Sequence, residues 1–244
     1  DRRGQIAVPW QEHYYTLSPC LPSDGTALTP VQHRQLLRNY GVATAGMHRA
    51  LATFPQDRLP AWIGRVDLAS EVLDTGFPII LPYLEEGEEV EFQAMRARLA
   101  RTMPTAFQDL PEQLIHRDCH AENLLSCGTV VTGIVDWDHL TIGPRILDVA
   151  YFAVQLAKRQ VRNPAAMAQW LDDFPLLLAG YEAESTLLEE EKAAFPQVLI
   201  AVPVLFAYWA IETGHSDDYI QTELDTMAWL YRNLEIVRER VQVT

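Results

Sequence analysis

The chain has 244 residues, 48% of them apolar, and a formal charge of −14 at neutral pH. That length and apolar content are enough to bury a substantial core. The acidic balance argues against nucleic acid and against an anionic membrane as partners, because both repel a negative surface. Three cysteines, Cys20, Cys119 and Cys127, have neither metal-ligand spacing nor an even-numbered disulfide framework, so we expect a reducing, cytoplasmic setting.

The N-terminal part of the chain predicts two strands and then a helix. Alternating and apolar stretches within residues 5–21 are typical of two short strands, and a proline-containing turn follows them. Thr29 and Pro30 form an N-cap pair that opens a helix to about residue 51. Six of its residues at helical spacing are expected to face inward: Leu36, Leu37, Tyr40, Ala43, Met47 and Leu51.

The rest of the chain predicts more helices around one polar stretch. We expect helices over about 88–101, 144–160, 164–182, 186–194 and 216–240. Pro175 is expected to kink or end the third of these helices. The apolar run 197–211 contains Pro203 and is too short for a membrane span, so it predicts a buried helix.

The polar stretch reads His116-Arg117-Asp118-Cys119-His120-Ala121-Glu122-Asn123, and Asp136 follows it thirteen residues later. This is the H-R-D-x-x-x-x-N spacing of a kinase catalytic loop, followed by its metal-binding aspartate. Phosphoryl transfer needs a carboxylate that orients the attacking hydroxyl and takes its proton, and Asp118 is ionised at neutral pH. Asn123 and Asp136 provide hard oxygen ligands of the kind that Mg²⁺ prefers.

A short hairpin is predicted between these two parts of the site. Residues 124–126 predict one strand, Cys127 and Gly128 a turn, and residues 130–135 the returning strand. A hairpin of that length brings Asp136 back near Asn123. The alternatives are ordinary polar loop residues, or the remnant of a kinase that no longer works. Four fixed positions and a correctly placed aspartate make coincidence the weaker explanation.

These residues, together with Asp136-Trp137-Asp138 and the run from Gly143 to Ala150, resemble the aminoglycoside phosphotransferase and choline kinase family. The resemblance implies an α+β, protein-kinase-like fold. In that fold a mainly helical C-terminal lobe has a small β-hairpin carrying the metal site, and a remnant of the N-terminal lobe sheet precedes it. It also implies Asp118 as the catalytic base and Asn123 and Asp136 as the Mg²⁺ ligands.

The resemblance further implies residues that brace the loop, namely His116, Arg117, His120 and Asp148. Arg117 departs from the family, which more often has glycine there, and we expect it to form an ion pair with a nearby acid such as Asp148. His48 matches a helix residue of the family that is expected to be structural. Cys119 lies inside the loop and is expected to be a buried, inert thiol.

A protein kinase is the nearest competing hypothesis. Protein kinases place an activation segment and an A-P-E motif between the metal-binding aspartate and the next helix. Here only about nine residues separate Asp136 from the helix that opens near Gly143 and Pro144, and no A-P-E motif follows. The sequence therefore favours a small acceptor over a peptide.

The elements that hold nucleotide phosphates are missing upstream. No glycine-rich loop precedes the catalytic loop, and the only lysines, Lys158 and Lys192, follow it. We therefore expect residues 1–21 to be the last strands and the hinge of an N-terminal nucleotide-binding lobe whose remainder lies outside this chain. Residues 22–244 would then be the C-terminal catalytic and substrate-binding lobe. A minimal protein that lacks the small lobe is the alternative.

The predicted hinge consists of Ser18, Pro19, Cys20 and Leu21. Backbone groups of this segment would meet the adenine of a bound nucleotide. An ordinary strand-to-helix turn with two prolines is the alternative.

Candidates for acceptor binding lie beside the metal-binding aspartate and at the end of the apolar helix. They are Asp138, His139, Tyr208, Trp209, Glu212 and His215. Trp209 and Glu212 would attract an ammonium group through cation–π and charge interactions. Core packing is the competing explanation for the two aromatic residues.

The predicted function is an ATP-dependent, Mg²⁺-dependent kinase that phosphorylates a hydroxyl of a small molecule, with GTP as the alternative nucleotide. Acceptors consistent with the resemblance are an aminoglycoside, an amino alcohol or an amino sugar, so a cationic acceptor is expected. The alternative is a catalytically inactive pseudokinase that binds a nucleotide or metabolite. Intact Asp118, Asn123 and Asp136 favour the kinase, but one fold serves many acceptors.

Overall fold

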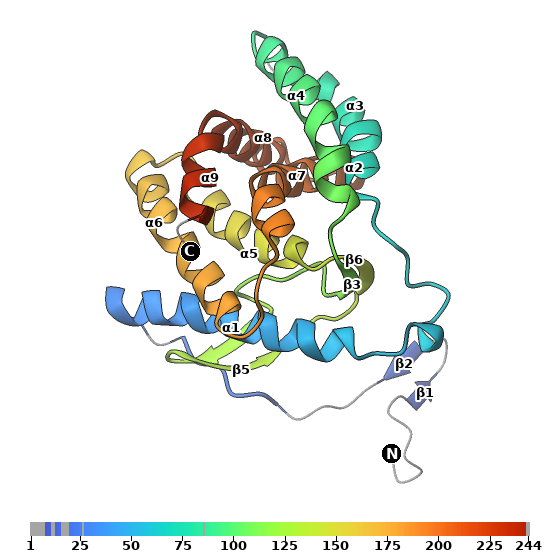
Figure 1. Cartoon of the computed structure of the whole chain (residues 1–244), viewed down its shortest axis with the longest axis vertical. Coiled ribbons are helices and arrows are strands. Elements are labelled where there is room, and N and C mark those ends of the chain that lie inside the picture. The colour runs from blue at the N-terminus through green and yellow to red at the C-terminus, as the bar shows by residue number, and fades with distance from the viewer. Residues whose placement is uncertain (1–7, 11–12, 16–19, 26, 85, 243–244) are drawn as a thin grey trace.

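A computed structural model describes residues 8–10, 13–15, 20–25, 27–84 and 86–242 (Figure 1). Within these ranges the chain is mainly helical, with three two-stranded antiparallel sheets. This confirms the predicted α+β class.

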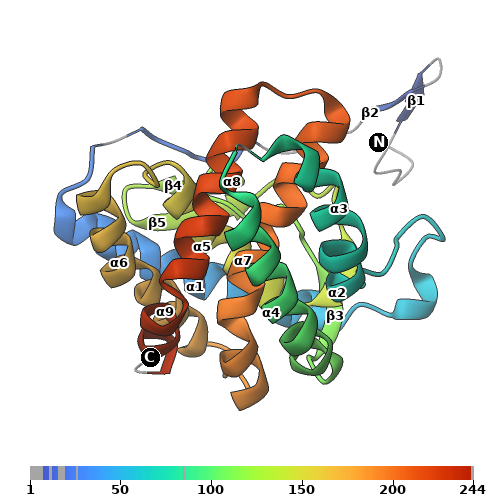
Figure 2. The same ribbon diagram turned by 90° about the horizontal axis from the view of Figure 1, so that it is seen from above.

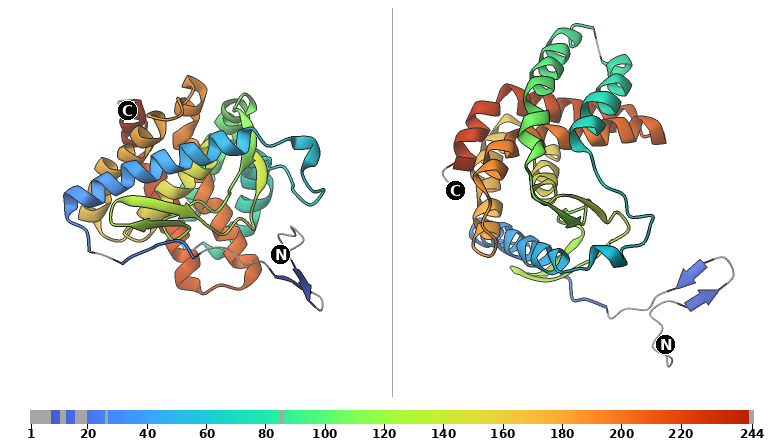
Figure 3. Two further views of the ribbon diagram at one scale, coloured as in Figure 1. Left: turned by 90° about the horizontal axis from the view of Figure 1, so that it is seen from below. Right: turned by 45° about the vertical axis from the view of Figure 1, so that its right-hand side comes forward.

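The first sheet lies near the start of the chain. Strands β1 (Val8–Trp10) and β2 (His13–Tyr15) pair antiparallel, which confirms the two strands expected there. Figures 1 and 3 show this hairpin standing beyond the helices. Its assignment to an N-terminal lobe stays a prediction.

The other two sheets hold the polar stretch. Strands β4 (Leu124–Cys127) and β5 (Val130–Ile134) form the predicted hairpin. Strand β3 (Glu112–Ile115) pairs with β6 (Thr141–Pro144), a strand that the sequence did not predict. The four residues of β6 include a glycine and a proline, so the strand depends on its remote partner. This pairing sets Glu112, the first residue of β3, opposite Pro144, which lies just before helix α5 (Ile146–Lys158).

Helices α1 (Pro30–Ala52) and α6 (Pro164–Glu182) cross at very short range. A Cβ atom added to Gly41 would lie 2.0 Å from the carbonyl oxygen of Leu177, and one added to Gly180 would lie 1.9 Å from that of Arg38. The two backbones meet where neither helix has a side chain, so glycine is required at both positions. Helix α6 continues through Pro175, so this proline does not end it.

Local sequence explains the start of α1. The Thr29 hydroxyl accepts a hydrogen bond from the Gln32 amide at 3.3 Å, and the Gln32 side chain accepts one from the Thr29 amide at 3.0 Å. This reciprocal capping box satisfies two backbone donors that the first turn leaves unpaired. The predicted N-terminus of the helix is therefore confirmed.

Two further predicted helices differ from the helices that the structure shows. Helix α4 (Glu89–Gln108) is longer than expected and passes through Pro104. The predicted final helix is two helices, α8 (Asp217–Arg232) and α9 (Leu234–Gln242). They are separated at Asn233, whose side-chain amide donates to the Trp229 carbonyl at 2.8 Å and so ends α8.

Helix α7 (Glu189–Thr213) joins the segments predicted separately as 186–194 and 197–211. It contacts α4, α5 and α8 and runs through the middle of the helices (Figure 2). A proline in a helix interior costs about 3 kcal/mol. The helix continues through Pro196 and Pro203 because residues on all its faces are buried. By length and composition α7 could cross a membrane, but 72% of its apolar window is buried, as in the core helices that pass the same test.

Residues 56–83 form short pieces that the sequence did not predict. They are η1 (Gln56–Arg58), α2 (Leu68–Ser70), the π-helical turn η2 (Glu71–Gly76), α3 (Phe77–Ile80) and η3 (Leu81–Tyr83). None is long enough to show a helical period. Phe77 and Ile80 are fully buried, so packing against α7 stabilises this segment.

Candidate active site

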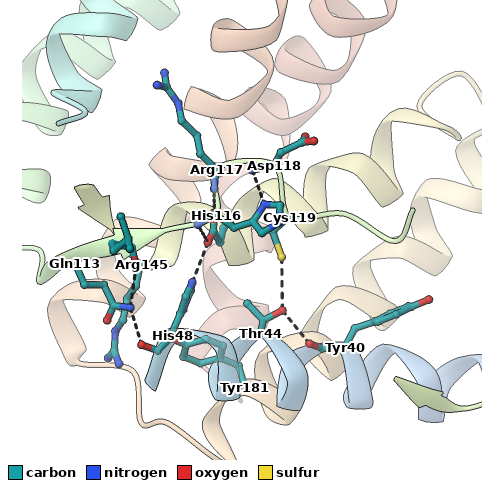
Figure 4. A network of polar contacts seen from close by, with 12 residues as sticks. Tyr40, Thr44, His48, Gln113, His116, Arg117, Asp118, Cys119, Arg145 and Tyr181 are labelled. Carbon is teal, nitrogen blue, oxygen red and sulfur yellow. Dashed lines mark hydrogen bonds and ion pairs between the residues drawn. The ribbon is translucent and has the colours of Figure 1, made fainter. Parts of the chain in front are cut away.

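The catalytic loop is held by one buried carboxylate. Asp148, in the first turn of α5, is fully buried and accepts hydrogen bonds from the backbone amides of His116 at 2.8 Å and Arg117 at 2.7 Å. His48 of α1 reaches the same carboxylate through Nε2 at 2.9 Å, and its Nδ1 lies 2.8 Å from the Tyr181 hydroxyl of α6. Three helices therefore fix the backbone of the loop (Figure 4), and His48 is structural as expected.

Arg117 forms an ion pair with an acid, as expected, but the acid is Glu71 and not Asp148. Its backbone amide bonds to Asp148, but its guanidinium donates to Glu71 of η2 at 2.9 Å. The residue has a left-handed backbone with φ of 66°. Figure 4 shows the side chains of Arg117 and Asp118 pointing away from the network that holds their backbone. Asp148 was the wrong acid because the left-handed backbone of Arg117, which the sequence does not show, directs the side chain elsewhere.

The two histidines of the loop contact it at different points. His116 is buried, lies 3.0 Å through Nε2 from the Val135 carbonyl, and accepts the Asp118 amide on Nδ1 at 3.3 Å. It therefore links the loop to the strand that leads to Asp136. His120 lies 3.4 Å through Nε2 from the Asp118 carboxylate, and its Nδ1 accepts the Glu122 amide at 3.2 Å.

Both carboxylate oxygens of Asp118 have partners. Oδ2 accepts a hydrogen bond from the Asn123 side chain at 2.8 Å, and Oδ1 accepts one from the Tyr151 hydroxyl. Burial raises the pKa of Asp118, but hydrogen bonds from His120, Tyr151 and Asn123 outweigh it and hold the pKa well below its ordinary value. Asp118 is therefore an oriented, ionised carboxylate that is 19% exposed.

Tyr151 is a site residue that the sequence analysis missed. It lies three residues after Asp148 on α5, so both side chains face the loop from one side of the helix. Burial and then the hydrogen bond to Asp118 raise the pKa of Tyr151 well above its ordinary value, so its hydroxyl stays a donor. The spacing from Asp148 was the available signal, but a tyrosine among apolar residues looks like a core residue.

Cys119 is fully buried within the loop. Its Sγ lies 3.7 Å from the Thr44 hydroxyl of α1, and burial raises the pKa of the thiol well above its ordinary value. A buried, protonated thiol is a poor nucleophile. The expectation of an inert cysteine is confirmed.

The hairpin places the two predicted metal ligands at the same end. Leu124 pairs with Ile134, and the Val135 amide donates to the Asn123 carbonyl at 2.9 Å, so Asp136 follows directly beside Asn123. The Asn123 amide nitrogen donates twice to Asp118, to its carbonyl at 2.9 Å and to its carboxylate, which leaves the Asn123 amide oxygen as a potential ligand. Asp136 is exposed and has a left-handed backbone with φ of 65°.

This donor set suits Mg²⁺. Mg²⁺ commonly binds through one or two protein carboxylates, with nucleotide phosphates and water supplying other oxygens. Among the described residues, no group of three or more His, Cys, Asp or Glu side chains could hold a metal. Asn123 and Asp136 thus offer an amide oxygen and a carboxylate, the two hard ligands that the sequence predicts.

A cavity of about 590 Å³ opens beside Asp118, which is the size of a small-molecule site. Its lining comes from the catalytic loop, the turn between β5 and β6, α5 with the residue that follows it, α7 and α8: Arg117, Asp118, His120, Glu122, His139, Leu147, Tyr151, Gln155, Lys158, Arg159, Val202, Leu205, Phe206, Tyr208, Trp209 and Tyr219. His139, Tyr208 and Trp209 were expected here. Asp138, Glu212 and His215 were also expected, but none of the three lines the cavity.

The part of the hinge that the structure describes lies on the hairpin. Ser18 and Pro19 are outside the described residues, whereas Cys20 is exposed and the Leu21 side chain packs against Gly133 of β5. Farther along, the Asp24 amide donates to the Ser126 carbonyl at 3.0 Å. The segment thus follows the strands that carry the metal ligands, and its contact with adenine stays a prediction.

A comparison with family models identifies the chain. The model of the phosphotransferase enzyme family matches residues 11–187, which is more than half of the sequence. The chain belongs to this family. A search of curated proteins finds no match. The family assignment confirms the resemblance seen in the catalytic loop and its hairpin.

Solved structures show that this phosphotransferase-family chain has the kinase-like fold. A microcompartment-associated aminopropanol kinase is 18% identical with a TM-score of 0.64, over 97% of this chain and 74% of that one. An amicoumacin kinase in complex with AMP-PNP, Ca²⁺ and Ami is 19% identical with a TM-score of 0.57, over 96% and 69%. The GDP complex of aminoglycoside 2′-phosphotransferase-IIIa is 15% identical with a TM-score of 0.58, over 84% and 64%.

Proposed function

We propose that this chain forms the catalytic part of an ATP- and Mg²⁺-dependent kinase that phosphorylates a hydroxyl of a small molecule. The arrangement around Asp118 is the observation that carries the proposal. An ionised carboxylate with fixed orientation faces a cavity of about 590 Å³, and two oxygen ligands lie at the adjacent end of the hairpin. Phosphoryl transfer depends mainly on such positioning and on charge neutralisation.

In the proposed reaction, the acceptor binds in the cavity with its hydroxyl beside Asp118. The hydroxyl oxygen attacks the γ-phosphorus of the nucleotide, the bond to the β-phosphate oxygen breaks, and Asp118 takes the proton. Asn123 and Tyr151 hold the carboxylate from opposite oxygens, so it does not have to reorient during the reaction.

The nucleotide and metal follow from the donor set and from the structural neighbours. Asn123 and Asp136 would hold Mg²⁺, which when bound neutralises phosphate charge. The neighbours were solved with AMP-PNP and with GDP, which supports a purine nucleotide, with ATP proposed here and GTP as the alternative. The remainder of the phosphate site would come from a small lobe, of which residues 1–21 would be the last strands.

The acceptor class is proposed from the same neighbours. Those proteins are named as an aminopropanol kinase and an aminoglycoside 2′-phosphotransferase. An amino alcohol, an amino sugar or an aminoglycoside is therefore a reasonable first set of compounds to test. One fold serves many acceptors, so the lining of the cavity must decide among them.

The test is an ATP-consumption screen of the full-length protein with Mg²⁺ and a panel of alcohols, with Asp118→Ala as the control. We expect turnover with at least one alcohol and loss of that turnover in the variant. No turnover on any alcohol, together with no binding of Mg-ATP, would contradict the proposal. Binding of Mg-ATP without turnover would instead favour the pseudokinase alternative.

A further inference from the structure

The helices supply an aromatic part of the cavity lining, which we call the aromatic wall. Tyr151 of α5, Phe206 and Trp209 of α7 and Tyr219 of α8 all line it. The Tyr151 and Phe206 rings meet edge to face, with centroids 4.8 Å apart. Walls of this kind bind either apolar rings or ammonium groups, the latter through cation–π attraction.

A cation of the protein itself already occupies this wall. The Lys158 Nζ lies 3.7 Å from the centroid of the Tyr219 ring and 5.5 Å from that of Phe206. It also contacts Glu223 Oε1, a carboxylate with no exposed surface, while Lys158 itself is 13% exposed. The buried acid balances the charge of Lys158 and holds its ammonium group over the rings.

The other charged groups of the cavity are also paired. The Arg117 guanidinium bonds to Glu71 at 2.9 Å, and the exposed Arg159 bonds to Glu122 at the rim. Of the acids that line the cavity, only Asp118 and Glu122 are present among the described residues, and Asp118 is committed to the reacting hydroxyl. Among the described residues, the cavity lining therefore has no unpaired acidic side chain that could bind an ammonium group of a ligand.

We infer that Lys158 fills the place that a substrate ammonium would take, and that the acceptor is instead an alcohol with an apolar ring and an oxygen acceptor group, such as a carboxylate, facing Lys158. This inference rests on the proposed function, because it names the acceptor of that site. It also departs from the cationic acceptor expected from sequence.

The physical basis is the number of donors on Lys158. An ammonium group has three N–H donors, and the Lys158 Nζ lies against the Glu223 carboxylate and over the Tyr219 ring. A further donor is available to a ligand, because Lys158 lines the cavity. A carboxylate at this point gains a charge-assisted hydrogen bond from Lys158, whereas a ligand ammonium finds the acid and the aromatic face already occupied by Lys158.

The test uses three probes that share a phenylpropane skeleton and a hydroxyl. They are 3-phenyllactate, which is anionic, 3-phenylpropane-1,2-diol, which is neutral, and phenylalaninol, which is cationic. Calorimetry on the full chain without nucleotide should show phenyllactate binding at least about tenfold more tightly than phenylalaninol, with the diol between them. Phenylalaninol or kanamycin binding more tightly than phenyllactate would overturn the inference.

Matched variants assign the preference to one side chain. Lys158→Met should remove most of the tenfold preference, while Lys192→Met, at the only other lysine of the chain, should leave it unchanged. Lys158→Met also leaves Glu223 buried without its partner, so the double variant Lys158→Met/Glu223→Gln keeps the test valid if the single variant fails to fold. An unchanged order of binding in the double variant would contradict the role of Lys158.

Because binding is measured without nucleotide, the two proposals fail separately. If phenyllactate is preferred but no alcohol is phosphorylated, the kinase proposal is wrong and the assignment of the cavity stands. If amines are phosphorylated and bound in preference to phenyllactate, the kinase proposal stands and the assignment of the cavity is wrong.

Discussion

The catalytic loop and the aromatic wall line the same cavity but are built from different kinds of segment. The chemistry of the loop comes from eight consecutive residues, and its backbone is fixed by Asp148 of α5. The wall combines Tyr151 and Lys158 with residues of α7 and α8 that are distant in sequence. A local motif can therefore identify the reaction, while acceptor selection depends on how three helices pack.

The largest effect is expected from Asp148→Asn. The change leaves a buried amide group facing backbone N–H donors and removes the anion from His48. Breaking a buried charged network of this kind costs about 3–5 kcal/mol. Urea denaturation should show this loss of unfolding free energy, and Asp57→Asn, at an exposed aspartate, is the control. A loss below about 1 kcal/mol would show that the loop does not depend on Asp148.

The close crossing of α1 and α6 brings His48 and Tyr181 into contact. Gly41→Ala tests this crossing. The new methyl would meet the Leu177 carbonyl, so one helix has to move at a cost of about 2–3 kcal/mol. Gly46→Ala is the matched control, because it lies in the same helix with no atom within 4 Å of an added Cβ. Thermal unfolding should show Gly41→Ala destabilised and Gly46→Ala unchanged or slightly stabilised. Equal midpoints for the two variants would contradict the close crossing.

The metal-binding end of the loop is tested by Asp136→Asn. Loss of the carboxylate should raise the Mg²⁺ concentration for half-maximal activity by at least about tenfold, with little change in the unfolding midpoint. Asp138→Asn serves as the control, since that side chain is exposed two residues farther along and does not line the cavity. The same Mg²⁺ requirement in both variants would remove Asp136 from the metal site.

The smallest effect concerns the cavity wall and depends on pH. Burial raises the pKa of Glu223 to about 7, against the lowering effect of Lys158. A carboxyl with a folded pKa above its unfolded value holds its proton more strongly when folded, so its contribution to stability is lost as pH rises from about 4.5 to about 7.

Glu223→Gln removes this dependence. Relative to wild type, the variant should gain on the order of 1 kcal/mol of unfolding free energy between pH 4.5 and pH 7. Glu182→Gln, in the other Lys–Glu pair of the chain, is the control for loss of one charge. Denaturation curves at both pH values supply the measurement, and a constant difference between Glu223→Gln and wild type would contradict the raised pKa.

The sequence predicts those parts of the molecule whose causes are local. The N-cap pair of Thr29 and Pro30 predicts the start of α1, and the spacing from Asp118 to Asn123 predicts the loop. The β4–β5 hairpin follows from two apolar runs around Gly128. Each of these depends on residues within a few positions of one another.

The features that were missed depend on remote partners. Strand β6 needs β3 to pair with, and α7 continues through two prolines only because other helices surround it. Arg117 turns toward Glu71 because of its left-handed backbone. From the sequence, Lys158 is an ordinary lysine at the end of a helix. In the structure, α8 places Glu223 and Tyr219 beside it. Packing decides the outcome for β6, α7 and Lys158, and backbone conformation decides it for Arg117.

Asp118→Asn tests the central claim most directly, because asparagine keeps the size of the side chain and loses its basicity. With an acceptor found by the screen, we expect the rate of phosphoryl transfer under saturating Mg-ATP to fall by about 10²–10⁴-fold, the usual contribution of a positioned acid–base group. The unfolding midpoint, measured on the same sample, should change little. A variant that transfers phosphate at the wild-type rate would contradict the assignment of Asp118 as the catalytic base.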